Sequence, residues 1–333
     1  MTVSSAPGKV YLFGEHAVVY GEPAVPCAIE RRATVSVEAR DDDHVRVEAS
    51  DLSLDGFTVE YAGTTDGRPD VDVPASLVEA AMGYVDAAVE QAREAVDRPD
   101  AGFDITVESS IPLGAGLGSS AAVTVAGIDA ATRELGHELP VRELANRAYH
   151  AEAAVQDGQA SRADTFCSAL GGAVRVEGDD CRAIEAPNLP LVVGFDGGAG
   201  DTGELVAGVR ALKAEYDFAA DTVSTIGDLV RTGERILDPE NEAEGRLAEL
   251  GGLMNFNHGL LASLGVSSRS LDSMVWAARE AGAHGAKLTG AGGGGCIVAL
   301  DPTPETLTAL QFTPGCEEAF RAELATDGVR REA

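Results

Sequence analysis

The sequence predicts an α+β protein of about two domains, and three observations support this. The chain has 333 residues, which is long for one domain. Short runs that alternate apolar and polar residues fill much of 3–59, as in half-buried strands. Segments that favour helices dominate 204–282, and a strand-like segment follows them. This mixture of strands and helices is typical of the α+β class.

The individual elements are expected in the following order. Strands within 3–59 are interrupted by the acidic turn 41–43 and by a polar stretch around 50–56. We then expect a helix at 75–96, a strand at 103–111, helices at 119–135 and 140–156, strands at 173–176 and 191–195, helices at 204–213, 219–236, 242–264 and 269–282, and a strand at 287–300. The prolines at 187 and 190 mark a candidate domain boundary.

The segment PLGAGLGSSAA, residues 112–122, joins the strand at 103–111 to a helix. Gly114, Gly116 and Gly118 let backbone amides approach a ligand beside the positive end of the helix dipole, which favours phosphate. The same letters fit the GxGxxA pattern of dinucleotide-binding folds, but that hypothesis needs a second parallel strand after the helix. A plain connecting turn stays an alternative for this segment taken alone.

The segment APGKVYLFGEHAVVYG, residues 6–21, places a carboxylate and an imidazole side by side at Glu15 and His16, with Lys9 upstream. The chain has only three lysines against 22 arginines, and two of the three, Lys9 and Lys287, lie in glycine-bearing motifs. Arginine cannot replace a compact ammonium that must fit close to one oxygen. We therefore expect Lys9 to be functional.

The segment KLTGAGGGGCIVAL, residues 287–300, has four successive glycines before an apolar run. Glycines cost backbone entropy on ordering and bury no side chain, so packing alone does not favour them. The pattern indicates a close approach by a ligand or by another backbone, and the alternative is a bulged turn against the other domain.

Taken in order, the three segments resemble the motifs of the GHMP kinase superfamily, and FGEHAVVYG resembles its mevalonate kinase branch. The resemblance covers nearly the whole chain. It implies a two-domain fold, with a domain like ribosomal protein S5 domain 2 over 1–187 and a ferredoxin-like domain over 188–333. ATP would lie at their junction and phosphorylate the C5 hydroxyl of mevalonate, giving 5-phosphomevalonate and ADP for isoprenoid biosynthesis.

The resemblance also implies roles for single residues. Asp164 would accept the proton of the substrate hydroxyl, and Lys9 would keep that carboxylate ionised and stabilise the attacking oxygen. Magnesium would be held by Ser120 and by Glu152. The ATP phosphates would lie against Pro112, Gly114, Ala115, Gly116, Leu117, Gly118, Ser119, Ser120 and Ala121, with Gly290, Ala291, Gly292 and Gly293 of the third motif nearby.

Contacts to mevalonate are implied for Glu15, His16 and Thr202, together with Lys9 and Asp164. The basic residue that often follows the threonine in the family is replaced here by glycine and glutamate, so the partner of the mevalonate carboxylate stays open. The spacing between Glu152 and Asp164 is one residue longer than in similar archaeal chains, with the surplus at 157–159. The other five histidines share no ligand spacing, and we interpret them as structural or surface residues.

Two alternatives to a mevalonate kinase remain. One is another small-molecule kinase of the superfamily, acting on phosphomevalonate or a sugar. The other is a binding protein that keeps the fold without turnover, but such a protein has no need of a proton acceptor such as Asp164.

Composition restricts the partners and the compartment. A net charge of −30 repels nucleic acid and anionic membranes, so we expect neither as a partner. Five scattered cysteines without CxxC pairs indicate a reducing compartment. We find no signal peptide and no apolar run of about 18 residues, and we expect a cytoplasmic enzyme. A homodimer is one assembly that the sequence leaves open.

The acidic, lysine-poor composition resembles that of proteins from a cytoplasm with molar salt. We predict that the protein loses structure in dilute buffer, because its 55 carboxylates then repel one another. At 1 M salt the screening length is only about 3 Å, which shortens the reach of that repulsion. Circular dichroism during dialysis from concentrated KCl tests this, and an unchanged spectrum in dilute buffer would disprove it.

Overall fold

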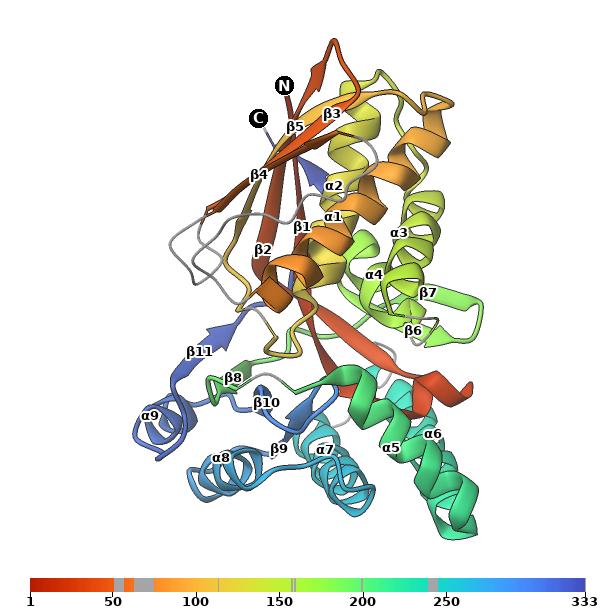
Figure 1. Cartoon of the computed structure of the whole chain (residues 1–333). Helices are drawn as coiled ribbons and strands as arrows, with labels where there is room; N and C mark the ends of the chain where they lie inside the picture. Colours follow the sequence, from red (N-terminus) through yellow and green to blue (C-terminus); the bar gives the residue numbers. More distant parts are fainter. Residues whose placement is uncertain are drawn as a thin grey trace.

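The protein is built from two β-sheets that each carry helices (Figure 1). This computed structural model describes residues 1–50, 57–62, 75–112, 114–156, 158, 160–198, 200–238 and 245–332. Both ends of the chain lie close together at the top of Figure 1. Within the described residues no helix is both long and apolar enough to cross a membrane.

The first sheet has the strand order β12-β1-β2-β5-β3-β4. Its pairs are antiparallel except for β3 and β5, which are parallel. A short hairpin, β6 and β7, continues from the lower part of β2. The bounds are β1 (Thr2–Phe13), β2 (Val25–Arg40), β3 (His44–Ser50), β4 (Phe57–Ala62), β5 (Gly102–Ser109), β6 (Ala173–Glu177), β7 (Asp180–Ile184) and β12 (Arg330–Arg331).

Four helices lie on one side of this sheet (Figure 1). They are α1 (Ala75–Val96), α2 (Ser119–Glu134), α3 (Val141–Val155) and α4 (Arg162–Leu170). The central helix α2 packs on β1 and β2 and is lined by buried alanines, so helix and sheet approach closely. Inside this interface the Ser4 hydroxyl donates a hydrogen bond of 2.7 Å to the buried Asp129 carboxylate.

The second sheet has the antiparallel order β11-β8-β10-β9. Its strands are β8 (Leu191–Phe195), β9 (Gly285–Thr289), β10 (Cys296–Leu300) and β11 (Glu318–Ala322). The helices of this part are α5 (Thr202–Glu215), α6 (Asp217–Leu237), α7 (Arg246–Ser263), α8 (Arg269–Glu280) and α9 (Glu305–Gln311). A 3₁₀ turn, η1 (Ala17–Tyr20), follows β1 and packs on α6.

The α+β prediction is confirmed, and most predicted elements are found within a few residues of their expected bounds. The expected strand at 287–300 is instead two strands, β9 and β10, joined by a turn that contains the glycines. The expected helix at 204–213 begins at Thr202, because the Asp201 carboxylate caps it by accepting a hydrogen bond from the Glu204 amide (2.9 Å). The expected start of the helix at 242–264 lies outside the described residues, and α7 is described from Arg246.

Six elements were not predicted, namely η1, α4, β7, α9, β11 and β12. All are short, with at most nine residues, so too few apolar positions repeat to give a periodic signal. The strand β12 pairs with β1, so the end of the chain returns to the first sheet. We propose 187/188 as the junction between the two parts, since β8 opens the second sheet directly after it.

Helix α7 packs on β9 with Gly251 of the helix against Gly285 of the strand. A Cβ on Gly251 would collide with the backbone of His284, whereas a Cβ on the next residue, Gly252, would meet nothing within 4 Å. We expect Gly251→Ala to destabilise the protein by about 1–3 kcal/mol through overpacking. Gly252→Ala should stabilise it by up to about 1 kcal/mol through helix propensity. Thermal unfolding of both variants in concentrated KCl checks this, and equal effects would contradict the packing argument.

Candidate active site

A cavity of about 640 Å³ lies where the two sheets meet, lined by residues from both. It brings together Lys9 from β1, the loop before α2, Glu152 from α3, Asp164 from α4 and Thr202 from α5. Most of the predicted site residues line it. Two predicted residues lie behind its wall: Ala121 is buried inside α2, and Gly293 packs toward Leu205 of α5.

The segment 114–120 forms a tight turn into α2. Gly118 takes a left-handed conformation (φ 74°) as the N-cap of α2, and no side chain there caps the first amides of the helix. The hydroxyl of Ser119 is buried and has no hydrogen-bond partner among the described residues. Free helix amides and an unpartnered hydroxyl beside a cavity fit an anionic ligand such as phosphate.

The glycines of the third motif are explained by contact with this loop. A Cβ on Gly290 would lie 2.8 Å from the Cα of Gly116, and a Cβ on Gly116 would lie 3.0 Å from the Thr289 carbonyl oxygen. Both glycines also have positive φ values, of 85° and 77°. The predicted close approach is therefore one of backbone to backbone, between the two sheets. The third motif therefore packs against segment 114–120, which is the candidate phosphate loop.

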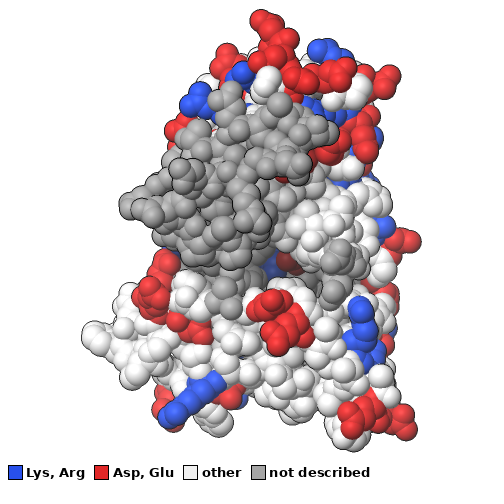
Figure 2. Space-filling view, viewed as in Figure 1, with Lys and Arg blue, Asp and Glu red and all other residues white. Residues whose placement is uncertain are grey.

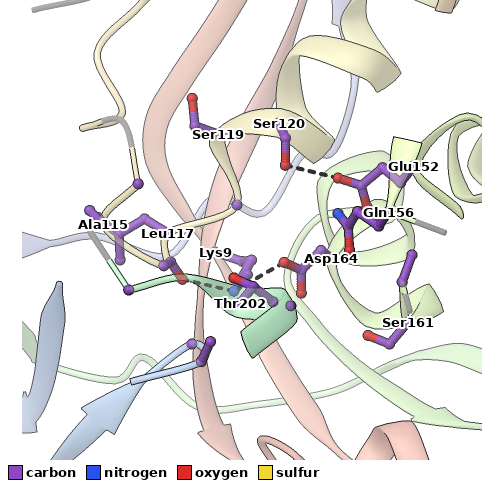
Figure 3. Close-up of a pocket in the computed structure, with 18 of the residues that line it drawn as sticks. Lys9, Ala115, Leu117, Ser119, Ser120, Glu152, Gln156, Ser161, Asp164 and Thr202 are labelled. Carbon is purple, nitrogen blue, oxygen red and sulfur yellow. Dashed lines mark hydrogen bonds and ion pairs between the residues drawn. The ribbon is translucent and has the colours of Figure 1, made fainter. Parts of the chain in front are cut away.

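Lys9 is held by the same loop at both of its ends. Its amide donates to the Leu117 carbonyl (2.8 Å) and its ammonium donates to the Gly116 carbonyl (2.8 Å). The stem of the side chain packs on Gly118, where a Cβ would lie 3.0 Å from the Lys9 Cγ. The side chain is 2% exposed, and its ammonium lies 3.2 Å from Oδ2 of Asp164 (Figure 3). Among the described residues lining the cavity, Lys9 is the sole lysine or arginine.

Asp164 lies in the first turn of α4, which Ser161 caps by accepting a hydrogen bond from the Ala163 amide. Its side chain is 27% exposed, so it can be reached from the cavity. A residue that the sequence analysis missed also contacts it: the Tyr11 hydroxyl donates to Oδ1 at 2.8 Å. The signal was present, because residues 9 and 11 of one strand point to the same face.

Ser120 and Glu152 come together as predicted. The Ser120 hydroxyl donates to Oε1 of Glu152 at 2.9 Å, as Figure 3 shows. Of residues 157–159, where the surplus residue was expected, only 158 is described. The surplus does not prevent the contact between Ser120 and Glu152. Burial, and then the negative charge of Asp164, raise the pKa of Glu152 to about 8. A buried carboxylate beside a hydroxyl is a donor set suited to a hard cation such as Mg²⁺, which would also relieve the cost of that burial.

Glu15 and His16, neighbours in sequence, point to different partners. The Glu15 carboxylate pairs with the ammonium of Lys287, and both side chains are almost fully buried. Burial raises the pKa of Glu15 and lowers that of Lys287, while their mutual attraction opposes both shifts. Lys287 also donates to the carbonyls of Tyr11 (3.4 Å) and Leu288 (2.6 Å), which occupies all three of its protons.

His16 has a φ of 60°, a conformation that non-glycine residues rarely adopt. Its Nε2 is bonded to the carbonyl oxygen of Ala291 at 2.8 Å, and because a carbonyl only accepts, Nε2 carries the hydrogen. Burial lowers the pKa of His16, so the ring is neutral and Nδ1 is an acceptor. Nδ1 is buried and has no partner among the described residues.

The remaining histidines take no part in this cavity. His258, for example, bonds Asp272 at 3.2 Å, and burial lowers its pKa to about 4. Within the described part of the chain, no three His, Cys, Asp or Glu side chains gather as a metal site.

Comparisons with known proteins identify the family of the chain. Residues 83–172 match the family of GHMP kinases N terminal domains, and residues 240–312 match GHMP kinases C terminal domains. Residues 2–39 match the galactokinase galactose-binding signature. A solved structure of galactokinase from Lactococcus lactis has a TM-score of 0.77 at 20% identity over 99% of this chain and 94% of that chain, which shows a shared fold.

Curated relatives are more similar and match over the full length. Mevalonate kinase of Pyrococcus horikoshii is 41% identical over 99% of this chain and 97% of its own, and that of Thermococcus gammatolerans is 40% identical over 99% and 98%. The solved mevalonate kinase of Methanococcus jannaschii has a TM-score of 0.77 at 27% identity, over 97% of this chain and 98% of its own. The chain belongs to the mevalonate kinase family of the GHMP kinases.

Proposed function

We propose that this protein transfers the terminal phosphoryl group of ATP to the C5 hydroxyl of mevalonate, giving 5-phosphomevalonate and ADP. The proposal depends most on the pair formed by Lys9 and Asp164, which lies beside the phosphate loop with 3.2 Å between ammonium and carboxylate. Phosphoryl transfer requires mainly alignment and charge stabilisation. Asp164 accepts the proton of the attacking hydroxyl, and Lys9 stabilises the negative charge that develops on that oxygen.

The amides of the phosphate loop and the first turn of α2 hold the phosphates of ATP, with the Ser119 hydroxyl as a further donor. Ser120 and Glu152 are the residues that fit Mg²⁺. A bound ion would neutralise phosphate charge and would favour the ionised form of Glu152. The negative charge of Asp164 acts on Glu152, so the ion would also reduce the repulsion between these two carboxylates.

On the substrate side, His16 and Thr202 supply polar contacts to mevalonate. The acceptor nitrogen of His16 suits a hydroxyl of the substrate better than its carboxylate, because a neutral Nδ1 has no proton to donate. Thr202 opens α5, so its hydroxyl and the neighbouring amides offer donors. Glu15 acts through its pair with Lys287, which fixes the turn that presents His16.

We further propose a cytoplasmic, salt-adapted enzyme that binds neither nucleic acid nor membrane. Figure 2 shows clusters of Asp and Glu at the top and over the lower part of the visible face, with separate Lys and Arg side chains among them. Against this surface the loop amides and Lys9 form a local site for anionic substrates.

Replacing Asp164 by Asn tests the assigned base. We expect kcat to fall by about 10²- to 10⁴-fold with little change in KM for ATP, because only the proton acceptor is removed. Asp228→Asn, an exposed carboxylate on α6, serves as the matched control. ADP release in concentrated KCl, with mevalonate, phosphomevalonate and galactose as acceptors, provides the readout. An equal loss in affinity for ATP would contradict the role of Asp164 as the base. If only phosphomevalonate or galactose were phosphorylated, mevalonate would be refuted as the substrate.

Glu152→Gln tests the proposed magnesium site. We expect the Mg²⁺ concentration for half-maximal rate to rise at least about tenfold, because an anionic ligand is lost. In the wild type this concentration should also rise as the pH falls below about 8, since protonation of Glu152 competes with the ion. That pH dependence should weaken in the variant. A wild-type-like magnesium titration of Glu152→Gln would remove Glu152 from the site.

A further inference from the structure

Tyr11 and Lys9 each contact a different oxygen of the Asp164 carboxylate. The Tyr11 hydroxyl donates to Oδ1 at 2.8 Å, and the Lys9 ammonium lies 3.2 Å from Oδ2. Both side chains leave the same face of β1, so one strand contacts both oxygens. A carboxylate with a separate partner on each oxygen cannot rotate freely about its last torsion.

Tyr11 is itself fixed from several directions. Its amide donates to the hydroxyl of Thr289 at 2.8 Å, and its carbonyl accepts from Lys287 at 3.4 Å. The Lys9 ammonium lies 4.4 Å from the centre of the Tyr11 ring. The side chain is only 5% exposed. The third motif thus holds Tyr11, and Tyr11 holds Asp164.

We propose that Tyr11 is a positioning residue, whose hydroxyl holds Oδ1 of Asp164 and thereby turns Oδ2 toward Lys9 and the reacting hydroxyl. This inference rests on the proposed phosphoryl transfer. Tyr11 contacts the base and not the reacting atoms, so it acts through Asp164. Orientation of a general base contributes to the rate only when substrate is bound and aligned.

The hydroxyl stays a donor throughout the working pH range. Burial, and then the negative charge of Asp164, raise the pKa of Tyr11 well above its usual value, so the phenol keeps its proton. The other titratable groups that act on Asp164 are Lys9 from β1, Glu152 from α3, Tyr84 from α1 and Cys167 from α4. Replacing the phenol by phenyl leaves all of these in place.

Tyr11→Phe removes the hydroxyl and keeps the ring under Lys9. Tyr20→Phe is a matched control, because the Tyr20 ring also lies under a lysine ammonium (Lys213, 3.7 Å) and its hydroxyl donates to a backbone carbonyl, that of Val206 (3.2 Å). We expect Tyr11→Phe to lower kcat about tenfold or more with an unchanged KM for ATP, since a hydrogen bond to a charged group is lost. Tyr20→Phe should keep wild-type kcat.

A double variant separates positioning from a merely structural effect. In an Asp164→Asn background, Tyr11→Phe should lower kcat no further. An additive double variant, or an equal loss in Tyr20→Phe, would overturn the inference. If the wild type phosphorylates none of the alcohols tested, the proposed function fails; if it does and Tyr11→Phe matches it, only the role of Tyr11 fails.

Discussion

The hydrogen bonds between Lys9 and the loop before α2 are the interaction on which the rest of the site depends. A lysine that is 2% exposed must have its charge compensated, and here the Gly116 carbonyl and the Asp164 carboxylate contact its ammonium. The loop accepts hydrogen bonds from both the amide and the ammonium of Lys9. These two bonds fix the position of the ammonium relative to the first turn of α2.

The second sheet contributes few side chains to the cavity, but it contacts and supports the residues of the first sheet that line it. Its glycine turn packs against the phosphate loop with no side chain between them, at Gly116 and Gly290. From the same segment the carbonyl of Ala291 fixes the His16 ring, and Lys287 neutralises Glu15 inside the interface. Three separate contacts thus join residues 287–291 to the loop before α2, to His16 and to Glu15, and the last two lie just after β1.

The sequence predicted the helix after the glycine loop from local signals, and that helix is found. The pairing of Lys9 with Asp164, which are far apart in the chain, was expected from the family resemblance, and it is also found. The contacts of Tyr11 and Lys287 were not expected, because their partners lie on other elements far along the chain. Glu15 and His16 were given one role, yet the chain turns sharply at His16, so adjacent side chains face different surroundings. Register and burial decide such contacts, and neither can be read from spacing.

The scarcity of lysine has a practical consequence for handling the protein. Two of its three lysines, Lys9 and Lys287, are shielded from solvent, at 2% and 0% exposure. Lys213, which belongs to α5, has its ammonium over the Tyr20 ring. Burial lowers the pKa of Lys213, which makes the free amine more available as a nucleophile. An amine-reactive dye or resin would thus attach at Lys213 and the N-terminal amine, leaving the ammonium groups of Lys9 and Lys287 untouched.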